Sequence, residues 1–152
     1  MTTRRAALHR WVFAGAGVYN LSWATFSILD PGWFFRVTAM PPSNHPELFA
    51  GMAMVVGLYG VAYLEVARVP DRGFVLAAVG LAGKVLGTVA FLALWTSGRW
   101  PASAAVMTIP NDVIWLVPFG LYLRDVWPVF RATLSPPGPR LLDPPAKEDR
   151  TG

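Results

Sequence analysis

Two charged side chains lie inside long apolar runs of this sequence. Lys84 falls near the middle of a run over residues 73 to 96, and Asp112 near the middle of a run over residues 102 to 123. An ammonium group at bilayer depth is costly unless a partner receives it, so such a residue indicates a functional site. We predict that Lys84 pairs with Asp112 inside the protein.

Further polar residues fall at a similar depth when positions are counted inward from the ends of each apolar run. Helical spacing also places a tryptophan on the face that carries Asp112. The candidate ligand-binding residues are Lys84, Asp112, Asn111, Asn20, Trp115 and Tyr59. Such a polar midplane must be satisfied within the protein, because the lipid offers it no water.

Three interpretations of the polar midplane stay open. The first is an ion pair that fixes the register of the helices, and the second is a pocket for a ligand or substrate built around that pair. The third is a proton or ion path, which needs a relay of ionisable groups across the membrane. For such a relay the sequence offers one further candidate, Glu65, near the end of its apolar run.

Pro110 leaves the register of the last run open. It either kinks a helix that continues through it, which frees the carbonyl of Val106 and leaves Asp112 near mid-depth, or it begins the helix. In the second case Asp112 would not reach Lys84. The kinked helix is favoured, because a helix from residue 111 to 123 would span only about 20 Å.

Composition excludes several classes of chemistry. The 152 residues are 54% hydrophobic and 14% charged, and they include no cysteine. Disulfides, thiolate metal sites, iron–sulfur clusters and thiol nucleophiles are therefore excluded. The two histidines, His9 and His45, lie outside the apolar runs, so a haem ligated by a histidine pair is not expected. We predict no metal and no cofactor, and no complete catalytic constellation supports an enzyme.

The apolar runs predict an all-α integral membrane four-helix bundle over residues 1 to 134. The expected spans are residues 11 to 29, 48 to 67, 73 to 96 and 102 to 123, each with roughly the 20 residues that cross a bilayer. A cleaved signal peptide is the alternative for the first span, but the sequence lacks a well-placed cleavage site. Residues 135 to 152 are rich in proline and charge, which predicts a disordered cytoplasmic tail.

Basic residues predict the orientation of the bundle. Ten of them lie on one side of the spans (Arg4, Arg5, Arg10, Arg68, Arg72, Arg124, Arg131, Arg140, Lys147 and Arg150) and two on the other (Arg36 and Arg99). The positive-inside bias therefore predicts cytoplasmic N- and C-termini. Since these residues flank apolar segments and form no single patch, no nucleic-acid partner is expected.

Small residues and an aromatic segment predict contacts between the helices. Gly83 with Gly87, and Ala53 with Gly57, have the spacing that lets helix backbones approach within a bundle, although the same motif also serves dimers. The aromatic residues 33 to 35 precede an outer loop over residues 38 to 46. This segment forms an anchored loop, an interfacial segment or a cap on the bundle.

Several short motifs resemble one family. They are Asn44-His45-Pro46-Glu47, Gly57-Leu58-Tyr59-Gly60, Gly80-Leu81-Ala82-Gly83-Lys84 and Asn111-Asp112-Val113-Ile114-Trp115 with Pro118-Phe119. Over residues 11 to 123 the chain resembles short four-helix bacterial membrane proteins without an assigned activity, broadly similar to DoxX-like proteins. The resemblance implies a multi-pass protein of the bacterial inner membrane and supplies no catalytic residues.

The favoured function is that of a binding module. A hydrophobic or amphiphilic molecule would enter the bundle, where Lys84, Asp112, Asn111 and Trp115 would orient its polar end. The alternative is a non-catalytic accessory subunit of a larger membrane complex. A membrane enzyme and a transporter are weaker hypotheses. The expected partners are membrane lipid, a hydrophobic ligand, and a membrane protein or a second copy of the chain.

Overall fold

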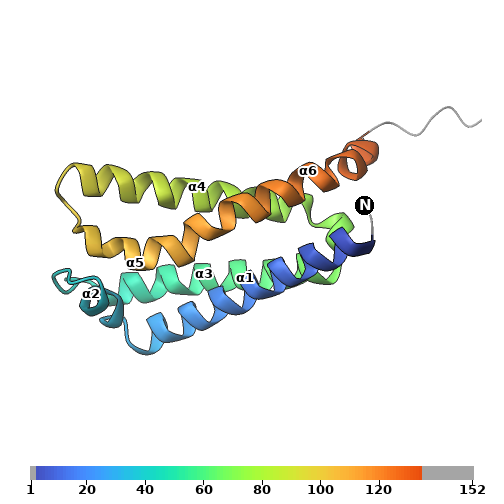
Figure 1. The fold of residues 1–152 in the computed structure, drawn as a ribbon. Coiled ribbons are helices and arrows are strands. Elements are labelled where there is room, and N and C mark those ends of the chain that lie inside the picture. The colour runs from blue at the N-terminus through green and yellow to red at the C-terminus, as the bar shows by residue number, and fades with distance from the viewer. Residues whose placement is uncertain (1–2, 135–152) are drawn as a thin grey trace, which may run out of the picture.

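The computed structural model describes residues 3 to 134, and every regular element in this range is helical (Figure 1). The elements in chain order are α1 (Thr3–Leu29), the short α2 (Trp33–Val37), α3 (Pro46–Arg68), a 3-10 turn (Pro70–Arg72), α4 (Phe74–Thr96), a second 3-10 turn (Ala102–Ala104), α5 (Ala105–Thr108), a π turn (Ile109–Val113) and α6 (Ile114–Leu134). The last four form one helical stretch, Ala102–Leu134. The predicted tail, residues 135 to 152, lies outside the described residues.

Four helices are long and apolar enough to cross a membrane, which confirms the predicted all-α class with four such helices. They are Thr3–Leu29, Pro46–Arg68, Phe74–Thr96 and Ala102–Leu134. The first begins before the predicted span and the last ends after it. The two extensions are in contact, because Arg5 donates a hydrogen bond of 2.7 Å to Asp125 and His9 lies 3.0 Å from the same carboxylate.

The long helices associate in two pairs. α1 packs along α3, and α4 packs along the last helical stretch, with both ends of the described chain at one end of the bundle (Figure 1). Near that end the pairs join through a buried apolar core. Its members are Phe13, Ala16, Tyr63, Val66, Ala77, Phe119, Tyr122 and Val126. The rings of Phe13 and Phe119 stack with centroids 4.4 Å apart, so α1 and α6 are in direct contact there.

α1 and α3 approach each other closely at two glycines. A Cβ atom added to Gly60 would lie 2.9 Å from the carbonyl oxygen of Gly17 and 3.1 Å from the backbone nitrogen of Leu21. The predicted pair of small residues on α3 also contributes, since Gly57 faces Ala24 of α1. Gly83 does not serve this purpose, because a Cβ there would meet no atom within 4 Å.

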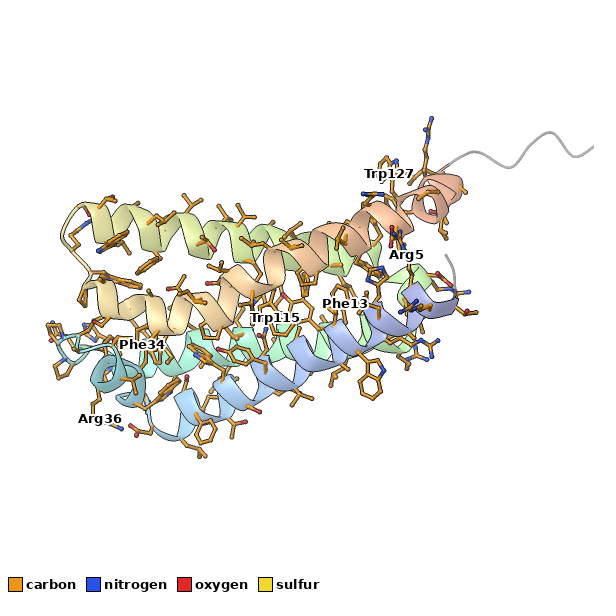
Figure 2. The ribbon with its side chains drawn as sticks, in the orientation of Figure 1. Arg5, Phe13, Phe34, Arg36, Trp115 and Trp127 are labelled. Carbon is orange, nitrogen blue, oxygen red and sulfur yellow. The ribbon has the colours of Figure 1, made fainter. Side chains whose placement is uncertain are left out.

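The aromatic segment caps the end of the bundle opposite the described termini. Trp33 donates a hydrogen bond of 2.9 Å to the Ser27 hydroxyl, and the ring of Phe34 lies 5.3 Å from that of Phe49. Figure 2 shows Phe34 and Arg36 at this end, far from Arg5 and Trp127. Arg36 pairs with Asp30 and holds the pKa of that carboxyl below its usual value. Of the three interpretations of this segment, the contacts favour the cap.

Gly60→Ala tests the close approach of α1 and α3. We expect it to lower the free energy of unfolding by about 1 to 3 kcal/mol, because the added methyl group meets backbone atoms that cannot move aside. Unfolding in mixed detergent micelles, followed by circular dichroism, measures the change. Gly51→Ala on the same helix is the control, since a Cβ at Gly51 would meet no atom within 4 Å. Equal stability of the two variants would contradict the expectation.

Candidate functional site

A π turn places Asp112 within the last helical stretch. The backbone N–H of Ile114 bonds to the carbonyl of Ile109, five residues back, so the turn around Pro110 is wider than an α-helical turn. Proline has no N–H and its ring crowds the preceding turn, and π turns of this kind are frequent at functional sites. The helix therefore continues through Pro110, as the favoured alternative expects.

Lys84 and Asp112 lie together in the interior. The Nζ atom of Lys84 is 3.7 Å from Oδ1 of Asp112, and it also donates a hydrogen bond to the backbone carbonyl of Asn111. Only 5% of Lys84 and 9% of Asp112 is exposed. A charge at this depth needs such a partner, because removing either group would leave the other charge buried and uncompensated.

Two asparagines leave their amide oxygens without partners. The amide nitrogen of Asn111 donates to Oδ1 of Asp112 over 2.9 Å, and that of Asn20 donates to the backbone carbonyl of Val56 over 3.4 Å. A carboxylate and a carbonyl can only accept, which fixes the orientation of both amides. Their Oδ1 atoms are buried and have no hydrogen-bond partner among the described residues. Each unpaired acceptor is costly and requires an explanation.

These groups line a cavity of about 310 Å³ to which each of the four long helices contributes. The lining residues are Asn20 from α1, Met52, Val56, Tyr59 and Tyr63 from α3, Gly80, Gly83, Lys84 and Gly87 from α4, and Asn111 and Asp112 from the π turn. Of the lining residues, Gly83 on α4 is exposed and Met52 on α3 is 65% exposed, so we infer that the cavity opens between these two helices. In a bilayer this opening would face lipid.

Five of the six predicted site residues therefore lie together in the cavity wall, and Trp115 does not. Its indole N–H donates a hydrogen bond of 2.8 Å to the carbonyl of Pro110. Its ring packs between those of Tyr19 and Phe119, midway along the bundle (Figure 2). Trp115 holds the π turn in place and does not line the cavity. Whether the five wall residues bind a ligand remains a prediction.

Glycines on α4 are a part of the site that the sequence pattern did not predict. A Cβ at Gly87 would lie 2.6 Å from Oδ2 of Asp112, so the missing side chain makes room for the carboxylate. A Cβ at Gly80 would likewise collide with the ring of Tyr63. The spacing of Gly80, Gly83 and Gly87 around Lys84 could have indicated them, because it places small residues on the side of the helix that carries Lys84.

A second polar cluster lies near the described termini. His9, which precedes the first predicted span, lies within α1 and is only 3% exposed. It contacts the Asp125 carboxylate and packs edge-on against the ring of Tyr122 at 5.3 Å. Among the residues that the structure describes, no group of three His, Cys, Asp or Glu side chains is placed to hold a metal ion.

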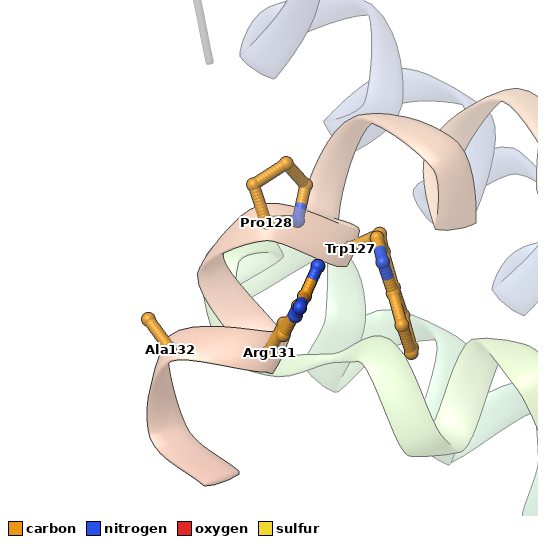
Figure 3. Close-up of a pocket in the computed structure, with 4 residues that line it drawn as sticks. All are labelled: Trp127, Pro128, Arg131 and Ala132. Carbon is orange, nitrogen blue, oxygen red and sulfur yellow. The ribbon is translucent and has the colours of Figure 1, made fainter. Parts of the chain in front are cut away.

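A second hollow, of about 350 Å³, lies at the end of α6 (Figure 3). Its lining consists of Trp127, Pro128, Arg131 and Ala132. All four come from one helix, so groups from different elements do not converge there. Trp127 and Arg131 instead have the character of an interfacial anchor at the end of a span.

The fold and the site together define a class: a helical protein with four helices able to cross a membrane and a polar cavity between them. No family model matches the chain, and neither a curated protein nor a solved structure matches it. The resemblance to DoxX-like proteins thus remains a prediction from the motifs alone.

Lys84→Met tests the buried pair. We expect it to lower the free energy of unfolding by about 3 to 5 kcal/mol, because Asp112 would be left buried without a cation. The double variant Lys84→Met/Asp112→Asn should have a free energy of unfolding closer to that of the wild type, since it leaves no uncompensated charge. Unfolding in mixed micelles measures both values.

Arg68→Met is the control for the loss of a cation. It breaks an ion pair with Glu65 at the exposed end of α3, where solvent screens the charges, so the free energy of unfolding should change far less than in Lys84→Met. If Lys84→Met and Arg68→Met lowered the free energy of unfolding equally, the buried pair would not contribute the stability expected of it.

Proposed function

We propose that this chain is a multi-pass protein of a bacterial inner membrane that binds a hydrophobic or amphiphilic molecule without transforming it. The observation that carries the proposal is the cavity of about 310 Å³ around Lys84 and Asp112, with its two unpaired amide oxygens. Sites for small molecules usually combine an apolar wall with a few convergent polar groups, and volumes begin at about 300 Å³.

A purely structural ion pair accounts less well for this arrangement. Protein interiors are close-packed, and a pair that only fixed helix register could be enclosed by side chains. Here Gly83 faces open space beside Lys84, and a methyl group there would fit without displacing any neighbour. The cavity and the unpaired acceptors both favour a bound molecule.

The entrance favours a ligand that arrives through the lipid. The opening lies between α3 and α4, where Met52 is exposed, and both helices are apolar enough to span a membrane. A water-soluble ligand would have to cross the apolar core or the aromatic cap. A lipid-soluble one would slide its polar end between the helices while its apolar part stayed outside.

We also propose that both termini are cytoplasmic. The basic residues of the helix ends gather at the end of the bundle that carries Arg5 and Trp127 (Figure 2), whereas Arg36 and Arg99 belong to the other end. The positive-inside bias then directs the Arg5 end toward the cytoplasm.

Gly83→Phe tests the binding site. The phenyl ring would occupy the cavity mouth, so we expect the variant to lose a small molecule that the wild-type protein retains when extracted in its own lipids. Native mass spectrometry measures the retained mass. Gly120→Phe is the matched control, because a Cβ at Gly120 also meets no atom within 4 Å but this residue does not line the cavity.

Two outcomes would count against binding. Equal retention by wild type and Gly83→Phe would place the molecule elsewhere on the protein. A second protein chain in fixed stoichiometry, without a small molecule, would instead favour the accessory-subunit alternative.

The absence of cysteine makes the orientation directly testable. We introduce Ser97→Cys, in the exposed turn after α4, or Thr133→Cys, near the end of α6. A membrane-impermeant maleimide added to intact cells, with the outer membrane permeabilised where there is one, should label Ser97→Cys. It should label Thr133→Cys only after the inner membrane is opened. The reverse pattern would contradict cytoplasmic termini.

A further inference from the structure

The hydrogen-bonding groups of the cavity constrain the chemistry of its ligand. The amide oxygens of Asn20 and Asn111 are acceptors that lack donors among the described residues. Asn20 is 2% exposed and lies on α1, whereas Asn111 lies in the π turn, so the two acceptors come from different helices. A ligand that satisfies both must carry at least two donors. Hydroxyl groups supply such donors without adding a charge.

The charges of the cavity disfavour an ionised head. Lys84 and Asp112 lie 3.7 Å apart and cancel each other. A carboxylate head would be attracted to Lys84 but repelled by Asp112, and it has no donor for the two amide oxygens. An ammonium head would donate and would be attracted to Asp112, but it would be repelled by Lys84 at close range.

The size of the cavity limits how much of the ligand it holds. At about 310 Å³ the cavity lies at the lower end of the range of small-molecule sites. That is enough for a small head and the first part of one chain. The remainder would leave past Gly83 and Met52, whose flexible thioether side chain adapts to apolar partners.

We infer that the ligand is an uncharged, single-chain amphiphile whose head carries at least two hydroxyl groups. The inference rests on the proposed function and specifies its ligand. In the bound state the head hydroxyls donate to Asn20 and Asn111, Lys84 donates to a head oxygen, and the chain lies between α3 and α4.

Three probes with the same oleoyl chain isolate the head. Monooleoylglycerol carries two hydroxyls, methyl oleate carries no donor, and oleate is anionic. The full-length protein is titrated with each in detergent micelles, and native mass spectrometry measures the bound fraction. We expect monooleoylglycerol to bind about tenfold more tightly than methyl oleate, and oleate to bind no better than methyl oleate.

Variants then assign the preference to the amide oxygens. Asn20→Leu keeps the approximate shape of the side chain but removes the acceptor, so it should reduce the tenfold preference for monooleoylglycerol over methyl oleate. Asn111→Leu is the second variant, used if Asn20→Leu fails to fold. Asn44→Leu is the matched control, since Asn44 lies in the exposed segment before α3 and should leave the preference intact.

The possible failures are distinguishable. Equal binding of monooleoylglycerol and methyl oleate, lost for both in Gly83→Phe, would overturn the hydroxyl head and leave the proposed function standing. If oleate bound most tightly, the inference of an uncharged head would be wrong, and the proposed function would still stand. If none of the probes bound, and no molecule were retained from the native lipids, the cavity would hold only water, and both the inference and the proposed function would be wrong.

Discussion

The ammonium group of Lys84 lies among apolar helices, and much of the surrounding structure serves to receive it. It requires a carboxylate and a further acceptor at the same depth, and the π turn of the last helical stretch presents both, through Asp112 and the carbonyl of Asn111. Trp115 bonds to the carbonyl of Pro110 in the same turn, and Gly87 leaves the space that the carboxylate fills. The pair thus depends on a helix deformation that a regular α-helix would not supply.

The two helix pairs keep a cavity open because they are joined at both ends. Near the described termini the ring of Phe13 on α1 contacts those of Phe119 and Tyr122 on α6. At the opposite end the cap meets α3 at Phe49 and reaches the other pair through the Ser103 hydroxyl, which donates a hydrogen bond of 2.5 Å to the carbonyl of Thr38. The ring of Phe34 also lies 6.5 Å from that of Trp100. Between these two contacts small residues line α4, so the pairs cannot close onto each other without a rearrangement of the ends. Close packing elsewhere thus coexists with a central cavity.

The sequence predicts those features that depend on the cost of burying charge and on the length of apolar runs. Four long helices and the proximity of Lys84 to Asp112 follow from these two quantities. The π turn, the unpaired amide oxygens and the supporting role of Trp115 depend instead on individual hydrogen bonds, which composition and periodicity do not encode. The burial of His9 was missed for a similar reason. Its partner, Asp125, lies on a helix that continues beyond the apolar run from which the span was predicted.

The arrangement of polar and apolar layers bears on whether the midplane conducts protons. Along α1 the inward face passes from His9 through Phe13 to Asn20, and these three residues are buried. The last helical stretch repeats this order, with Asp125 and Asp112 on either side of a layer that contains Phe119 and Tyr122. An aromatic layer therefore lies between the two polar clusters. Glu65, the further candidate for a proton relay, is instead paired with Arg68 at the exposed end of α3. A relay requires ionisable groups within reach of one another. The layered order instead encloses the Lys84 cavity on the side of the termini and leaves its opening between α3 and α4, which favours a ligand site over a path.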